Sequence, residues 1–182
     1  MNSTAQEDYD RVLYPGAAHT QTHPDRLATL ASLFGMHPAP VERCRVLEIG
    51  CTDGGNLIPM AHGLPDADFT GIDIGARSLA VGRECVEALG LKNIRLLELD
   101  ILDVPEDFGA FDYIIAHGIY SWVPAAVREK ILALCRAHLA PQGVAYISYN
   151  VYPGSHVRDA VRGMMRFHVR ENRMTRETRR TI

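Results

Sequence analysis

A glycine-rich turn follows the first apolar segment of strand type in the chain. This segment covers residues 45–49, and the spacing Glu48-x-Gly50-x-x-x-Gly54 leads from it into a helical pattern that begins at Asn56. Glycines at the carboxyl end of a strand let a ligand approach the backbone, and the helix that follows offers free N–H groups. In an open α/β sheet, ligands bind in the crevice beyond the first strand. The turn therefore predicts a ligand site.

Two carboxylates follow the next two segments of strand type. Asp73 lies 23 residues after Gly50, at a strand end where a carboxylate can accept hydrogen bonds from both ribose hydroxyls, and Asp100 follows the third strand. The alternative for each is a turn or helix N-cap residue. Asp73 alone would also suit NAD. However, the dinucleotide fingerprint needs a glycine where the chain has Thr52, which disfavours a nicotinamide oxidoreductase.

The spacing Glu48-x-Gly50-x-x-x-Gly54 resembles the first motif of class I S-adenosylmethionine-dependent methyltransferases. In that family, an acidic residue after the third strand receives the adenine amino group, and its neighbour packs on the ring. The resemblance implies S-adenosyl-L-methionine as cofactor and methyl transfer as the reaction. The cofactor-binding residues that it implies are Glu48, Gly50, Cys51, Gly54, Asn56, Asp73, Ile74, Asp100, Ile101 and His117.

Several longer sequence segments are similar to a narrower group of methyltransferases. Residues 117–124 and 146–154, and the opening with Tyr9, Tyr14 and residues 22–27, resemble bacterial methyltransferases that carry a methyltransferase regulatory domain after the catalytic one. Some similar members methylate lysines of outer-membrane proteins. The resemblance covers residues 9–168 and implies a protein lysine as acceptor, with a small molecule as the alternative. We expect the chain to be a fragment or single domain, because the regulatory domain has no counterpart in it.

The acceptor side is expected after the fourth and fifth strands. For an amine acceptor, His117 is the candidate base, and Tyr120 is the second candidate catalytic residue. The alternative for His117 is a hydrogen-bonded histidine under the cofactor. The Asp/Asn-Pro-Pro-Tyr signature of enzymes that methylate DNA bases is absent after the fourth strand, so DNA is not expected as a partner. A second functional hypothesis is a cofactor-binding domain without activity of its own.

Segments of strand type alternate with helical segments, which predicts a parallel sheet covered by helices. We therefore expect an α/β, Rossmann-like class I methyltransferase fold with a doubly wound, mostly parallel sheet that lacks strands six and seven. The predicted parts are an N-terminal helical lid or cap (1–44), a cofactor-binding core (45–154) and a basic C-terminal helix (155–182). The lid would carry Tyr9, Tyr14, His19 and His23, or be a plain surface helix. The strand segments are 45–49, 69–74, 94–99, 111–116 and 144–149, and the helical ones are 24–34, 56–63, 76–89, 124–139 and a helix from about 158.

Composition excludes several classes of protein. Of the 182 residues, 47% are hydrophobic and 23% charged, which is typical of a globular domain, and the net charge of -3 argues against a surface that binds nucleic acid or membrane as a whole. The four cysteines are scattered, so neither a disulfide framework nor a metal site is expected. No secretory signal and no membrane span are recognised, which indicates the cytoplasm.

The C-terminal segment is basic. Arg158, Arg162, Arg166 and Arg170 repeat every four residues and would form one stripe on a helix. This stripe is interpreted either as a site for an acidic protein or RNA, or as a solvated face or one that packs on a missing domain.

Overall fold

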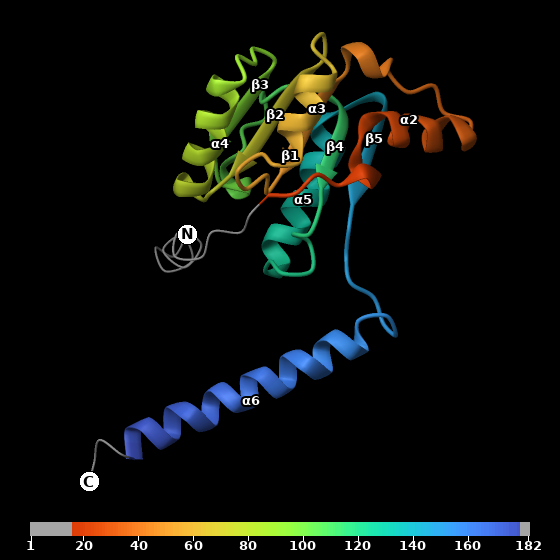
Figure 1. The fold of residues 1–182 in the computed structure, drawn as a ribbon. Helices are drawn as coiled ribbons and strands as arrows, with labels where there is room; N and C mark the ends of the chain where they lie inside the picture. Colours follow the sequence, from red (N-terminus) through yellow and green to blue (C-terminus); the bar gives the residue numbers. More distant parts are fainter. Residues whose placement is uncertain (1–15, 179–182) are drawn as a thin grey trace. The chain divides into compact units, whose positions relative to one another are not determined.

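The computed structural model describes residues 16–178, with side chains described through residue 170 (Figure 1). Its helices are α2 (Pro24–Leu33), α3 (Leu57–Gly63), α4 (Ala76–Ala88), α5 (Ala125–His138) and α6 (His156–Thr178), with 3-10 turns η1 (Thr20–Thr22), η2 (Val41–Arg43) and η3 (Ile101–Asp103). The strands are β1 (Arg45–Ile49), β2 (Asp68–Asp73), β3 (Ile94–Glu98), β4 (Phe111–Ala116) and β5 (Leu139–Ile147). The described chain divides into two compact units between Ser148 and Tyr149.

The first unit is built on one parallel sheet with the strand order β3-β2-β1-β4-β5 (Figure 1). The order reverses beside β1, where the chain crosses from β3 to β4. This is the switch point at which open α/β sheets bind ligands. The structure confirms the predicted Rossmann-like methyltransferase fold, and no strand follows β5 within residues 16–178.

Two apolar layers cover the two faces of the sheet. Val46 and Phe69 pack with Leu57 of α3 and Leu79 of α4 on one face. On the other face, the neighbouring strand positions, such as Leu47 and Ile114, pack with Ile131 of α5. Since successive side chains of a strand point to opposite faces, strands covered on both faces are apolar at nearly every position. Glu48 is the exception within β1, and it faces the α3 side, where Asn56 meets it.

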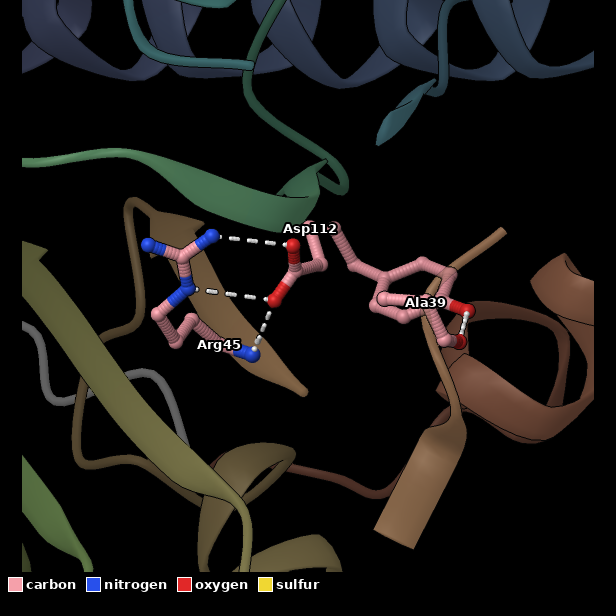
Figure 2. A network of polar contacts seen from close by, with 4 residues as sticks. Ala39, Arg45 and Asp112 are labelled. Atoms are coloured by element: carbon pink, nitrogen blue, oxygen red, sulfur yellow. Dashed lines mark hydrogen bonds and ion pairs between the residues drawn. The ribbon is translucent and has the colours of Figure 1, made fainter. Parts of the chain in front are cut away.

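An ion pair joins β1 to β4 at the amino end of the sheet (Figure 2). Asp112 is 9% exposed, and its carboxylate accepts hydrogen bonds from the backbone N, Nε and Nη2 of Arg45 at 2.8, 3.2 and 3.0 Å. The next residue, Tyr113, donates from its hydroxyl to the carbonyl of Ala39 at 2.9 Å and so ties the segment before β1 to the sheet. These contacts lie at the end of the strands away from the glycine turn.

The fifth strand differs from its predicted range. It begins at Leu139, directly after α5, and ends at Ile147 instead of spanning 144–149. Leu139 pairs with Phe111, while Val144 pairs with Tyr113, so residues 140–143, which lie between the predicted helix 124–139 and the predicted strand 144–149, form a bulge within the strand. Gln142 adopts a φ of 63° inside this bulge. The Pro141-Gln142-Gly143 sequence of these residues is also found in turns, so the sequence pattern does not indicate a strand there.

The second unit contains α6, which begins two residues earlier than predicted. Arg158, Arg162, Arg166 and Arg170 form the predicted stripe at four-residue spacing. Apolar side chains of the same helix are exposed, with Val157 at 77% and Met164 at 69%. In the part of the chain that the structure describes, no helix combines the length and apolar character needed to cross a membrane.

Candidate functional site

The turn after β1 reverses the chain through residues with positive φ. Gly50 and Gly54 have φ values of 75° and 73°, which explains glycine at both positions, and Thr52 lies between them at 51°. The backbone N–H groups of Gly50 and Cys51 donate to the carbonyl of Ile72 at 2.9 and 3.2 Å. These bonds extend the pairing of β1 with β2 into the turn and leave the backbone of the turn at the edge of a pocket.

Asp73 is fixed at the carboxyl end of β2. Its Oδ2 accepts from the backbone N–H of Thr52 at 2.9 Å, and its Oδ1 accepts from that of Gly75 at 2.8 Å. The turn interpretation and the ribose interpretation of this residue are compatible, because each carboxylate oxygen has a second lone pair. Asp73 is half-buried.

The predicted adenine contacts lie farther along the same edge. Asp100 is the N-cap of η3, where its Oδ1 accepts from the backbone N–H of Leu102 at 2.9 Å. Ile101 is 9% exposed and packs in the apolar layer under α5. Ile74 follows β2 directly. The local role of Asp100 as a helix cap is therefore present, and the adenine role of Asp100 and Ile101 stays a prediction.

A pocket of about 210 Å³ opens beside the glycine turn. It brings together five of the predicted site residues, while Gly54, Asp73, Ile74, Asp100, Ile101 and Tyr120 do not line it. The residues that line it are Gly16, Ala17, His19, Glu48, Gly50, Cys51, Thr52, Asn56 and His117. Gly16 and Ala17 were not among the sequence candidates, because no chemical group on either side chain indicates a site.

Glu48 supplies a buried carboxyl group to this pocket. The residue is 4% exposed, and its Oε1 accepts from Nδ2 of Asn56 at 2.8 Å. Its Oε2 is buried without a hydrogen-bond partner among the described residues. Burial raises the pKa of Glu48 to about 7; the hydrogen bond from Asn56 opposes this shift, and the nearby Asp73 adds to it. A buried acceptor oxygen without a partner calls for a donor from a ligand or from water.

His117 follows β4 and faces the same pocket. Its ring centroid lies 4.1 Å from that of His19 and 5.9 Å from that of Tyr146. Its Nδ1 is buried without a partner among the described residues. Burial, and secondarily the nearby His19, lower the pKa of His117 below 6.5, so the imidazole is neutral at pH 7. Tyr120, the other candidate, is half-buried and packs against the apolar layer under α5.

The residues predicted to form a lid separate into three groups. His19 lines the pocket, whereas His23 caps α2 by accepting from the backbone N–H of Asp25 at 3.2 Å. Tyr9 and Tyr14 lie outside the described residues.

A wider groove, of about 600 Å³, lies between α2 and residues 35–42. It contains none of the motif residues, and Glu42 is the only carboxylate among its lining residues. Although it is larger, we assign the chemistry to the smaller pocket, because buried polar atoms without partners converge there. Among the described residues, no cluster of His, Cys, Asp and Glu has the arrangement of a metal site.

Comparisons with known proteins agree with this geometry. The family model described as "Methyltransferase domain" matches residues 46–143. PKMT2 from Rickettsia typhi, solved in complex with AdoHcy, superposes with a TM-score of 0.82 at 39% identity over 85% of this chain and 30% of that one. Two uncharacterized proteins of Rickettsia prowazekii, RP789 and RP028, are 46% and 40% identical over 88% and 92% of this chain.

The chain spans only part of the length of these relatives, with 29% of RP789, 67% of RP028 and 30% of PKMT2 covered. The segment that the family model matches nevertheless contains most of β1, all of β2, β3 and β4, the start of β5 and the glycine turn. S-adenosylmethionine is the cofactor of the matched family. The chain belongs to the class I S-adenosylmethionine-dependent methyltransferases.

Proposed function

We propose that the chain binds S-adenosylmethionine in the pocket beside the glycine turn and transfers its methyl group to an amine, with a protein lysine as acceptor. The observation that carries the proposal is the buried Oε2 of Glu48, which has no partner among the described residues and belongs to a residue that lines this pocket. The name of the similar protein PKMT2 abbreviates protein lysine methyltransferase, which favours the lysine.

The pocket fits the amino-acid end of the cofactor. In this arrangement the α-ammonium group donates to Oε2 of Glu48, which completes the hydrogen bonding of that carboxylate. Gly50 lines the pocket and leaves its backbone open to the methionine part. The ribose hydroxyls then reach the free lone pairs of Asp73, and the adenine lies toward Asp100.

The bound sulfonium supplies an activated methyl group, so the protein has to position the acceptor and remove a proton. A lysine ammonium has no lone pair for the displacement until it loses a proton. His117 is neutral, and its Nδ1 has no hydrogen-bond partner among the described residues, so it can accept this proton. The amine lone pair then forms the N–C bond as the C–S bond breaks, and the electron pair of that bond stays on sulfur in S-adenosylhomocysteine.

A second candidate is a module that binds the cofactor without activity of its own. The small share of PKMT2 and RP789 that the chain spans favours this candidate, because residues outside that share can contribute to an acceptor site. Both candidate functions place the cofactor in the same pocket, and only the first predicts methyl transfer.

Transfer of tritium from S-adenosyl-[methyl-³H]methionine to poly-L-lysine tests the proposal. We expect label on lysine side chains with the wild-type chain, loss of the label in Asp73→Ala, and slow transfer with normal cofactor binding in His117→Asn. Thr29→Val is the matched control, since Thr29 is exposed and bonds only within α2. Binding of S-adenosylhomocysteine without transfer would favour the module, and absence of binding would contradict both candidates.

A further inference from the structure

Residues 16–22, here called the N-terminal strap, lie against the glycine turn. The backbone N–H of Gly16 donates to Oδ2 of Asp53 at 3.0 Å, and that of His19 donates to Oδ1 of Asn56 at 2.9 Å. A Cβ atom at Gly16 would overlap Oδ1 of Asp53, so the approach requires glycine there. The strap therefore follows the turn at two points that are 37 residues away in the sequence.

Asn56 connects the strap to the cofactor end of the pocket. It is 5% exposed, and its Nδ2 donates both to Oε1 of Glu48 at 2.8 Å and to Oγ1 of Thr22 at 3.0 Å. Its Oδ1 accepts from the backbone of His19. The hydroxyl of Thr22, which is fully buried, donates to the carbonyl of His19 at 2.8 Å. The side-chain amide of Asn56 thus binds Glu48 and both ends of the turn from His19 to Thr22.

The His19 ring covers His117. With centroids 4.1 Å apart and ring planes tilted by 52°, the two imidazoles are in contact, and the His19 ring contributes to the burial of His117. The groups that face His117 are His19 from the strap, Tyr146 from β5 and Glu48 from β1, which lines the same pocket.

We propose that His19 is a positioning residue for His117, and that Asn56 couples the placement of His19 to the cofactor end of the pocket. The inference rests on the proposed function, in which His117 takes the proton from the acceptor amine. It adds that the same network orients the ammonium-binding carboxylate of Glu48 and the acceptor side. The N-terminal strap thereby helps to position the residues of the site.

The titration of His117 in the chain labelled with ¹³C-histidine tests this inference without an acceptor. His117→Asn identifies its resonance. In His19→Ala we expect the pKa of His117 to rise toward 6.5, because both its cover and a neighbouring positive charge are removed. In His19→Phe the rise should be smaller, because the ring cover remains and only the charge is lost.

Variants of the network test the coupling. Thr22→Val removes the hydrogen bonds of a buried hydroxyl, and we expect it to raise the pKa of His117 and to weaken binding of S-adenosylhomocysteine about fivefold, the equivalent of one hydrogen bond of about 1 kcal/mol. Asn56→Asp, which places a second carboxylate beside Glu48, should change both readouts more strongly. Thr29→Val makes the same chemical change on the exposed face of α2 and should change neither.

The outcomes separate the two proposals. An unchanged His117 titration in His19→Ala would overturn the positioning role, and weaker cofactor binding with unchanged titration in Thr22→Val and Asn56→Asp would overturn the coupling. Failure of the wild-type chain to bind S-adenosylhomocysteine, with the His117 shifts as expected, would instead contradict the proposed function.

Discussion

The carboxyl group of Glu48 makes cofactor binding depend on pH. Its pKa lies near 7 in the unliganded chain because the residue is 4% exposed. Glu48 lines the pocket, and its Oε2 has no hydrogen-bond partner among the described residues. An ammonium group on that oxygen favours the ionised carboxylate. Binding of S-adenosylhomocysteine should therefore release the proton of Glu48, and the affinity should fall as the pH drops through 7.

The magnitude follows from this pKa. If the ligand binds only the ionised form, about half a proton is released per ligand at pH 7, and the dissociation constant is about tenfold larger at pH 6 than at pH 8. That factor corresponds to about 1.4 kcal/mol. In more acidic solution, protonation of His117, whose pKa is lowered chiefly by burial, adds a further positive charge to the pocket.

The same pKa has a consequence for stability. The folded-state pKa of about 7 lies above the ordinary value of 4.5, so the protonated carboxyl favours folding. This contribution is complete below pH 4.5 and is lost as the pH rises through 7. Glu48→Gln, which retains the acceptor oxygen for Asn56, should therefore raise the free energy of unfolding of the unliganded chain at pH 8, by up to about 3 kcal/mol.

Isothermal titration calorimetry from pH 6 to 8, in buffers of different ionisation enthalpy, measures both the affinity and the proton release. Glu48→Gln should bind weakly with an affinity that is nearly independent of pH. A wild-type dissociation constant that changes less than twofold over this range would refute the reasoning, and so would an unchanged pH dependence in Glu48→Gln.

Three further substitutions test the site and the sheet. Asp73→Asn replaces an acceptor of two loop N–H groups, so we expect S-adenosylhomocysteine to bind at least about tenfold more weakly by calorimetry; unchanged affinity would contradict the ribose assignment. Thr52→Gly removes a β-branched side chain from a residue with a φ of 51°. The relief of backbone strain should exceed the entropic cost of glycine, so the melting temperature should rise by about 2–4 °C, whereas a decrease would be evidence against strain in the turn. Asp112→Ala removes the acceptor of three hydrogen bonds from Arg45 at the opposite end of the sheet; it should lower the free energy of unfolding by about 1–3 kcal/mol in urea titrations and leave cofactor affinity unchanged, and a loss of affinity would show that the two ends are not independent.

The sheet was predictable because its strands are covered on both faces. Segments such as 111–116 are buried at every position, and this produces continuous apolar runs that indicate a parallel sheet. Asp73 was placed correctly at a strand end for the same reason. The start of β5 was not predicted, since pairing of Leu139 with Phe111 is a tertiary contact that overrides the turn composition of the bulge.

The candidate site was only partly predictable. Glu48 and His117 carry recognisable chemistry, and their strands converge at one edge of the sheet. The contribution of Gly16 and Ala17 depends on backbone contacts across 37 residues, and neither side chain has a polar group that would indicate it. Asn56 was predicted as a cofactor contact; it lines the pocket, but its amide is engaged by Glu48, Thr22 and His19, a role that only the arrangement in space reveals.

A crystal structure of the chain with S-adenosylhomocysteine would test the central claim most directly. The account predicts the amino-acid end in the pocket beside the glycine turn, with its nitrogen within about 3.2 Å of Oε2 of Glu48 and its ribose hydroxyls on Asp73. A ligand seated elsewhere, or one whose amino group leaves Oε2 of Glu48 without a partner, would contradict it.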